Sequence, residues 1–242
     1  MELTANSKIS FINCSISLIL MQKVITADGT ETFLNEQVQE TYHSQTGGVE
    51  EALKKYAIPC KIAELSKANG KIKVLDVCSG MGYNGAMAID VALEANPNCE
   101  IEVIGLEYDP KTIQLIQEVN PPIKCYNWFK QLNPQKLEFQ QGKVHVKFIL
   151  GDARETCKQL PEEYFDAIFF DPFSPKPAPE MWSKEFFTEM YRVIKITGIL
   201  ATFSCARMAR ENMAAAGFMY DDGPIVAGRR GPGTIATKWV FP

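Results

Sequence analysis

The chain has 242 residues, of which 46% are hydrophobic and 22% are charged, a composition typical of a globular protein and not of a disordered one. Its 25 basic and 29 acidic residues leave a net charge of −4, so any contact with nucleic acid needs a local patch rather than an overall field. Seven scattered cysteines without a C-x-x-C pair, and only two histidines, argue against a disulfide framework and against a zinc or histidine-rich metal site. We therefore expect a cytoplasmic protein without a metal.

Residues 1–70 are predicted to form an extension that packs on the main domain, residues 71–242. Within the extension, Ser10–Thr26 has the pattern of one or two strands, and Asp28-Gly29 has the composition of a hairpin turn. The apolar run 11–21 is shorter than the roughly 20 residues that span a bilayer, contains polar residues and lacks a strongly basic lead. A strand is the favoured interpretation of this run, and no membrane contact is expected.

A polar segment surrounds the start of the first predicted helix. Ser44 and Thr46 can cap a helix that runs from about Gly48 to Tyr56. Groups able to form hydrogen bonds are concentrated in this short stretch, at Glu40, Tyr42, His43, Ser44 and Gly47. A polar cap over the core and a substrate site explain the stretch about equally well.

From residue 71 onward the chain alternates strand and helix patterns, which indicates a parallel sheet with helices on its faces. The predicted strands cover 72–78, 101–107, 144–150, 165–171 and 198–204. The predicted helices cover 83–95, 110–118, 154–160, 184–195 and 207–216, and a final strand pair is expected near 218–221 and 234–241. Residues 121–142 are predicted to be an irregular insertion, either a flap on the substrate side or decoration.

A glycine-rich turn follows the first of these strands. Gly80, Gly82 and Gly85 match G-x-G-x-x-G, whose glycines let the backbone approach a ligand at the start of a helix. Glu107 ends the next strand, where an acid can hold the ribose hydroxyls of an adenosine. Asp76 lies just before the glycines, where it would repel the pyrophosphate of NAD or FAD but would suit the ammonium group of S-adenosylmethionine (SAM). SAM is therefore favoured over a dinucleotide and over a glycine turn without a ligand.

Two further strand ends carry acids. Asp152 can accept a hydrogen bond from the adenine amine, cap the helix that follows, or do both. Asp171 opens the loop D-P-F-S-P-K-P-A-P, which its prolines make rigid. Asp171 and Phe173 would face the activated methyl group, where a carboxylate can orient and deprotonate an amine and an aromatic ring can position a flat base. Asp171 is also a candidate ligand of SAM, and Lys176 of the same loop is a candidate substrate contact. The alternative is a stiff loop with a structural aspartate.

A basic loop near the C-terminus is a third candidate site. Arg229 and Arg230 lie between glycines in G-R-R-G-P-G, an arrangement suited to RNA phosphates, although such loops are more often solvated turns. Arg207 and Arg210, one helical turn apart, can extend this patch.

Taken together, these motifs resemble the methyltransferase domain of the MnmC-type enzymes of tRNA wobble-uridine modification. The matching stretches are D-G-T-x-T-F at 28–33, E-T-Y-H-S-Q-T-G-G-V-E at 40–50, L-D-V-C-S-G-M-G-Y-N at 75–84, D-P-F-S-P-K-x-x-P-x-M-W at 171–182 and G-R-R-G-P-G at 228–233. The resemblance covers nearly everything from about Val24 to Thr237.

This resemblance implies an α/β, Rossmann-like SAM-dependent methyltransferase fold with an N-terminal β-hairpin extension. The implied reaction is methylation of the 5-aminomethyl group of the wobble uridine in tRNA, giving 5-methylaminomethyluridine or its 2-thio form. Carried over by motif, the residues that line SAM would be Gly80, Gly82, Glu107 and Asp152. Those on the acceptor side would be Asp171, Phe173, Tyr42, His43, Ser44, Arg229 and Arg230. The two-part enzymes of this type carry a FAD-dependent oxidase domain that this chain lacks, so another enzyme would have to supply the aminomethyl group.

Two rival hypotheses use the same sequence features. One is a methyltransferase for a small amine or a protein, or an aminopropyltransferase that uses decarboxylated SAM, although aminopropyltransferases usually supply more acids for a polyamine. The other is a catalytically silent RNA-binding protein that retains the fold. Acids at every expected strand end favour an enzyme over a silent protein.

Overall fold

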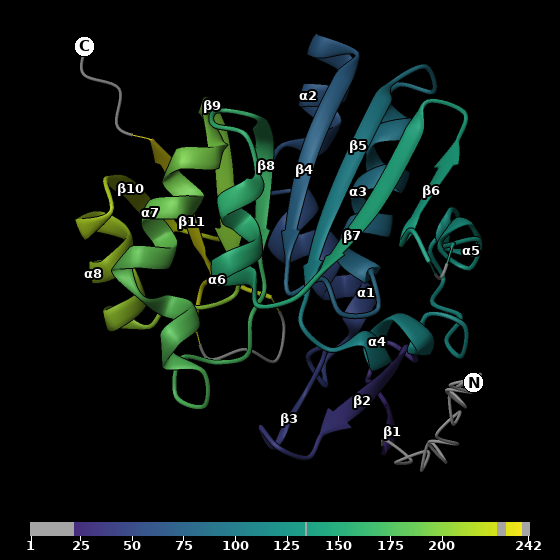
Figure 1. The fold of residues 1–242 in the computed structure, drawn as a ribbon, viewed down its shortest axis with the longest axis horizontal. Helices are drawn as coiled ribbons and strands as arrows, with labels where there is room; N and C mark the ends of the chain where they lie inside the picture. The colour runs from purple at the N-terminus through teal and green to yellow at the C-terminus, as the bar shows by residue number, and fades with distance from the viewer. Residues whose placement is uncertain (1–21, 134, 227–230, 239–242) are drawn as a thin grey trace, which may run out of the picture.

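The structure is a computed structural model that describes residues 22–133, 135–226 and 231–238 (Figure 1). Two sequence predictions lie outside these residues. They are the strand pattern within 10–21 and the arginine pair at 229 and 230.

An eight-stranded sheet forms the centre of the molecule, in the order β10-β11-β9-β8-β4-β5-β7-β6 (Figure 1). Its strands are β4 (Lys71–Val77), β5 (Glu100–Glu107), β6 (Glu138–Gln141), β7 (Val144–Leu150), β8 (Phe165–Phe170), β9 (Ile194–Thr202), β10 (Phe218–Asp222) and β11 (Thr234–Lys238). The five strands from β9 to β7 are parallel, whereas β6, β10 and β11 pair antiparallel with their neighbours. The chain winds outward from β4 in both directions, so the carboxyl ends of β4 and β8 mark the switch point where open α/β sheets bind ligands. The predicted Rossmann-like α/β fold is confirmed.

Helices cover both faces of this sheet, and burial on both sides explains the uninterrupted apolar strands. All six residues of β8, sequence F-D-A-I-F-F, are buried. In Figure 1, α2 (Ile62–Asn69) and α3 (Tyr83–Ala95) lie behind β4 and β5, and α6 (Ala153–Thr156) and α7 (Lys184–Val193) lie in front of β8 and β9. The remaining short helices of the main domain are α4 (Pro110–Leu115), α5 (Tyr126–Phe129), α8 (Arg207–Ala215) and the 3₁₀ turns η2 (Cys157–Gln159) and η3 (Pro179–Trp182).

A second, three-stranded antiparallel sheet precedes the main one. Its strands are β1 (Lys23–Ile25), β2 (Glu31–Asn35) and β3 (Glu40–Thr41), with β1 and β2 joined as a hairpin. This sheet lies beyond the carboxyl ends of the parallel strands (Figure 1). The chain then enters α1 (Gly48–Glu51), which continues as the π-helical turn η1 (Ala52–Ala57). The predicted helix is therefore present, but half of it has π geometry, and α2 was not predicted at all.

The cap of α1 differs from the prediction. The hydroxyls of Ser44 and Thr46 lie 2.8 Å apart and bond each other, and neither makes a capping hydrogen bond with the helix. Instead, Asp28 of the β1–β2 turn accepts a hydrogen bond from the backbone N–H of Glu50 (3.1 Å). The hairpin therefore fixes the start of α1 through a contact distant in sequence.

The prediction for residues 121–142 was wrong. Tyr126 and Phe129 of α5 are only 2% and 1% exposed, and they belong to the main hydrophobic core. The segment then forms β6, which pairs with β7 and becomes the edge of the sheet. These residues are therefore a structural part of the domain rather than a flap or decoration.

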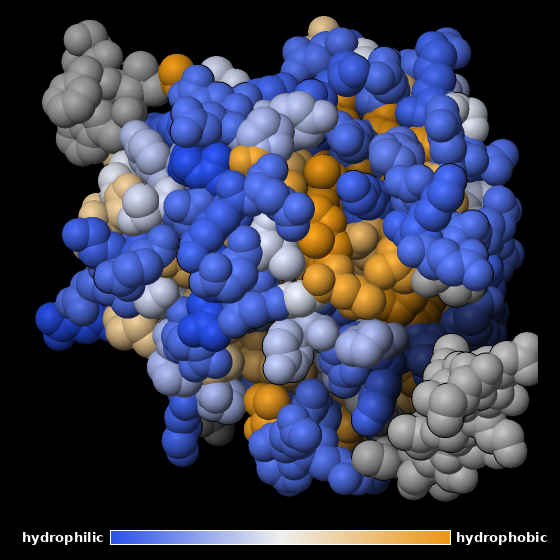
Figure 2. All heavy atoms as spheres, in the orientation of Figure 1, coloured by the Kyte–Doolittle hydropathy of each residue, from blue (hydrophilic) through white to orange (hydrophobic). Residues whose placement is uncertain are grey.

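One face of the sheet is only partly covered. Figure 2 shows apolar side chains gathered in a hollow over β5 and β7. The reason is that α6, the helix after β7, is a single turn and leaves Ile149 and Leu150 partly exposed.

Candidate functional site

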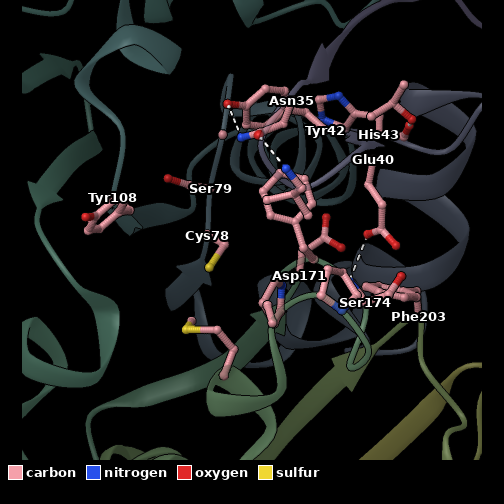
Figure 3. Close-up of a pocket in the computed structure, with 18 of the residues that line it drawn as sticks. Asn35, Glu40, Tyr42, His43, Cys78, Ser79, Tyr108, Asp171, Ser174 and Phe203 are labelled. Atoms are coloured by element: carbon pink, nitrogen blue, oxygen red, sulfur yellow. Dashed lines mark hydrogen bonds between the residues drawn. The ribbon is translucent and has the colours of Figure 1, made fainter.

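A cavity of about 710 Å³ opens at the carboxyl ends of the central strands, at the switch point of the sheet. The glycine-rich turn after β4, the ends of β5 and β7 and the loop after β8 line one side. The small sheet and α1 line the other. Figure 3 shows Tyr42 and His43 of the N-terminal extension above Cys78 and Asp171, with Tyr108 at the far side.

The glycine-rich turn has the backbone geometry that its sequence requires. Gly80 and Gly82 have positive φ angles of 52° and 78°, and Cys78 also adopts a left-handed conformation, with φ of 62°. A Cβ on Gly82 would lie 2.8 Å from the Phe129 ring, so this glycine is needed for packing as well as for the turn. The backbone N–H of Gly80 points to Glu107 and donates to it at 2.8 Å.

Glu107 is nearly buried and lies at the end of β5, where the sequence predicts an acid that binds adenosine. One of its oxygens accepts from Gly80, and the other accepts from the N–H of Asp109 at 2.8 Å. Burial raises the pKa of Glu107, and the backbone N–H donors oppose this shift. Each carboxylate oxygen keeps a second lone pair that could accept a ribose hydroxyl.

Asp152 performs the capping role that was one of its two predicted functions. Its side chain accepts from the N–H of Arg154 (2.9 Å) at the start of α6, and the Arg154 guanidinium also binds it, at 2.6 Å. These hydrogen bonds hold the pKa of Asp152 below its usual value. Asp152 also lines the cavity, so a second role toward an adenine amine is compatible with the cap.

Asp171 lies at the centre of the cavity wall, directly after β8. Tyr56 of η1 donates to its Oδ1, and the amide of Asn84 in the first turn of α3 donates to its Oδ2 at 2.9 Å. Desolvation by burial raises the pKa of Asp171 well above its usual value, and repulsion from Glu51 adds to this shift. Sequence reasoning missed Tyr56, Asn84 and Glu51, because nothing local in the sequence links them to Asp171.

The small sheet contacts the loop after β8 on the acceptor side of the cavity. The rings of Tyr42 and Phe173 lie 5.5 Å apart, and the carboxylate of Glu40 accepts a hydrogen bond from the N–H of Ser174 at 2.9 Å (Figure 3). The hydroxyl of Tyr42 accepts from the Asn35 amide at 3.2 Å, and burial raises its pKa to about 12. Tyr42 is therefore a neutral aromatic wall at physiological pH.

Three other predicted site residues are buried at the cavity: His43 is part of its lining, whereas Asp76 and Gly82 are not. His43 is 5% exposed and stacks on Tyr83 with ring centroids 4.3 Å apart, and burial lowers its pKa to about 4. Asp76 is also buried, with a pKa raised by burial to about 7, and it accepts from the N–H of Gly85 at 3.2 Å. Asp76 and Gly82 shape the glycine turn and are not among the side chains that line the cavity.

The remaining residues that were predicted to contact the acceptor differ in where they lie relative to the cavity. Ser44 lines the cavity, and its N–H donates to Glu51 at 2.8 Å. Lys176 is exposed in the loop after β8 and is not among the lining residues. Arg229 and Arg230 lie outside the described residues.

A family model described as S-adenosyl-L-methionine-dependent methyltransferase matches residues 118–238, half of the chain. The chain belongs to this family. The crystal structure of MnmC2 from Aquifex aeolicus has a TM-score of 0.80 and 31% sequence identity, over 92% of this chain and 72% of that chain. The expected resemblance to MnmC-type methyltransferase domains is thereby confirmed.

Two curated relatives show how much of a longer protein this methyltransferase spans. An uncharacterized protein of Methanocaldococcus jannaschii is 32% identical over 221 residues, which are 89% of this chain and 59% of that protein. The tRNA 5-methylaminomethyl-2-thiouridine biosynthesis bifunctional protein MnmC of Ectopseudomonas mendocina is 28% identical over 199 residues, which are 76% of this chain and 30% of that protein. The chain therefore corresponds to about a third of the bifunctional protein. Within 22–133, 135–226 and 231–238, the structure has no helix long and apolar enough to cross a membrane.

The cavity of this methyltransferase suits SAM, which carries a positive sulfonium and an ammonium group. Within the described residues, six carboxylates line it: Glu40, Glu51, Glu107, Asp152, Asp171 and Glu180. The guanidinium in the same lining, that of Arg154, is already bound to Asp152. The buried Oδ1 of Asn84 has no hydrogen-bond partner among the residues that the structure describes, so it offers a further acceptor beside the cavity. The residues present therefore fit the cofactor that the family requires.

Proposed function

We propose that this protein methylates the primary amine of 5-aminomethyluridine at the wobble position of tRNA, giving 5-methylaminomethyluridine or its 2-thio form. The observation that carries the proposal is the carboxylate of Asp171, oriented by two hydrogen bonds in an acidic cavity beside the Phe173 ring. The name of the bifunctional MnmC relative, which refers to tRNA 5-methylaminomethyl-2-thiouridine biosynthesis, supports the same substrate.

Gly80, Glu107 and Asp152 would hold the adenosine part of SAM, through the backbone approach at the glycine turn and the two strand-end carboxylates. Asp76 would act from behind the turn by fixing the backbone at Gly85. When bound, SAM supplies a methyl group on a positive sulfonium. An amine can accept that methyl only when its nitrogen has a free lone pair in line with the methyl–sulfur bond.

Asp171 would bind the acceptor as an ammonium ion, accept one of its protons and leave a neutral nitrogen facing the methyl group. Its raised pKa makes it a stronger base than an ordinary aspartate, which suits this role. Phe173 and Tyr42 would present aromatic surface to the uracil ring. After transfer, the nitrogen carries the new methyl group, and the sulfur leaves as a neutral thioether.

The RNA contacts outside the cavity are proposed from sequence. Ser44, Lys176, Arg229 and Arg230 would border the entrance, and the lysine and arginines would contact RNA phosphates. His43 would support this side by holding the small sheet against Tyr83. Residues 71–242 would form the methyltransferase domain and residues 1–70 the extension that completes its acceptor side. The enzyme would act in the cytoplasm on tRNA whose aminomethyl group another enzyme has made.

Transfer of labelled methyl groups tests this proposal against its rivals. The protein is incubated with methyl-labelled SAM and one of three acceptors: tRNA that carries 5-aminomethyluridine, the same tRNA with an unmodified wobble uridine, or a polyamine. Label that enters only the first tRNA and is released by ribonuclease supports the proposal. Label in the polyamine would favour a small-amine methyltransferase instead. SAM binding without any transfer would favour the silent RNA-binding protein.

A further inference from the structure

A buried tyrosine from the N-terminal extension reaches the proposed catalytic carboxylate. Tyr56 is fully buried in η1, its ring packs on Phe169 of β8 at 5.6 Å, and its hydroxyl donates to Asp171. The π-helical turn from Ala52 to Ala57 sets the position of Tyr56 along this helix. Such turns are rare and frequently occur at functional sites.

The second donor comes from the opposite side. Asn84 is buried in the first turn of α3, and its Nδ2 donates to Asp171 Oδ2 at 2.9 Å. Because an ionised carboxylate only accepts hydrogen bonds, Asn84 must present its nitrogen to Asp171 and keep its own oxygen for another donor. Each Asp171 oxygen therefore has one fixed protein donor.

Nearby acidic groups act against the ionisation of Asp171. Glu51 of α1 and Asp76 of β4 are acids close enough to repel its negative charge. The side chain of Lys55, the neighbour of Tyr56 in η1, runs toward Gly233. Its Cδ lies 3.7 Å from the position that a Cβ on Gly233 would take. Among the described residues, the hydrogen bonds from Tyr56 and Asn84 favour the carboxylate over the neutral acid.

We propose that Tyr56 and Asn84 are positioning residues that keep Asp171 as an oriented carboxylate, ready to receive a cationic amine. This inference rests on the proposed role of Asp171 in the reaction. It assigns a function to η1, which links the N-terminal extension directly to the chemistry.

Tyr56→Phe tests the inference because it removes one hydroxyl and retains the buried ring. Loss of the donor raises the pKa of Asp171, so protonation removes its charge at a higher pH than in the parent protein. SAM binding is measured by calorimetry across a pH series, and methyl transfer is measured over the same series. A hydrogen bond to a charged group changes an equilibrium constant by roughly tenfold. We therefore expect the SAM affinity and the methyl-transfer rate of Tyr56→Phe to be about tenfold below those of the parent at the acidic end of the series and to recover at the alkaline end.

Tyr83→Phe is the matched control. Tyr83 is equally buried, but its hydroxyl donates to the backbone oxygen of Glu31 at 2.9 Å, away from Asp171. This control should leave the midpoint of the pH dependence unchanged. Asn84→Leu, a substitution of similar volume, should move the midpoint in the same direction as Tyr56→Phe.

A loss in Tyr56→Phe that is equal at every pH, or one that Tyr83→Phe reproduces, would overturn the inference and leave Tyr56 a packing residue. If Tyr56→Phe does not fold, Asn84→Leu takes its place: a pH midpoint that does not move in this variant would overturn the inference. The SAM-binding measurement needs no acceptor. A parent protein that fails to methylate aminomethyluridine would therefore refute the proposed function without removing the evidence that Tyr56 controls the charge of Asp171.

Discussion

The carboxylate of Glu40 accepts a hydrogen bond from the backbone N–H of Ser174 at 2.9 Å, although 134 residues separate them in the sequence. The contact joins β3 of the small sheet to the loop that carries Asp171 and Phe173 (Figure 3). Beside it, the ring of Tyr42 packs against that of Phe173. The extension therefore supports the acceptor side of the cavity from above.

Glu40→Ala should slow methyl transfer about tenfold and change the free energy of unfolding by less than about 1 kcal/mol, because the lost hydrogen bond is partly exposed but fixes the loop. Initial rates and urea unfolding give the two quantities. Glu36→Ala is the control, since Glu36 is exposed in the turn just before β3 and, among the described residues, its side chain makes no hydrogen bond with the loop. Equal rates in the two variants would show that the contact does not organise the loop.

Gly82→Ala should destabilise the protein by about 2–4 kcal/mol, through strain at positive φ and through the clash of its Cβ with the Phe129 ring, 2.8 Å away. Gly142→Ala provides the comparison, because Gly142 has a similar φ of 59° but nothing within 4 Å of the added Cβ. That variant should lose only about 1–2 kcal/mol. Urea unfolding of both variants tests the prediction, and similar losses would mean that Phe129 moves away at little cost.

Asp171→Asn should lower the rate of methyl transfer at saturating SAM by about 10²–10³-fold, because the amide keeps the shape of the side chain but cannot accept a proton. The protein should remain folded and should still bind SAM through the glycine turn and Glu107, but about tenfold more weakly, because the negative charge of Asp171 is missing. Single-turnover rates and calorimetric SAM titrations separate these effects. Unchanged turnover would remove Asp171 from the mechanism.

The burial of His43 should make the protein less stable in mild acid. Its pKa is lowered from 6.5 to about 4, so between these values the unfolded chain binds a proton that the folded chain does not. Stability therefore falls as the pH drops from about 6.5 to 4, by about 3 kcal/mol for this residue. Asp76 acts in the opposite direction, because its folded-state pKa is raised to about 7 and protonation relieves the cost of its burial.

The variant His43→Phe separates the contribution of the histidine to this pH dependence from that of Asp76. It retains a ring that can stack on Tyr83 and has no titrating nitrogen. The difference in unfolding free energy between the parent and His43→Phe should depend on pH over this range and should become constant above about pH 7. A difference that stays constant down to pH 4 would contradict the assigned pKa.

The sheet could be predicted because its strands are continuous apolar runs separated by amphipathic segments. Placing β4, β5, β7 and β8 side by side brings Glu107, Asp152 and Asp171 to one edge, since the carboxyl ends of parallel strands meet there. The glycine-rich turn could also be predicted from the local sequence, because the positive φ angles at Gly80 and Gly82 favour glycine.

Contacts between distant parts of the chain could not be predicted. The hydrogen bond from Tyr56 to Asp171 spans 115 residues, and the packing of Phe129 on Gly82 crosses from an apparent insertion to the cofactor turn. The cap of α1 by Asp28 has the same origin. In each case the local sequence was ambiguous, and tertiary packing selected the partner.

The most direct test of the central claim is nucleoside analysis by mass spectrometry after the protein has acted on tRNA that carries 5-aminomethyluridine. With SAM present, we predict that 5-aminomethyluridine disappears while 5-methylaminomethyluridine appears in equal amount, and that Asp171→Asn leaves the starting nucleoside in place. If the wobble nucleoside is unchanged while the parent protein binds SAM normally, the proposed substrate is wrong and the acidic cavity serves a different amine.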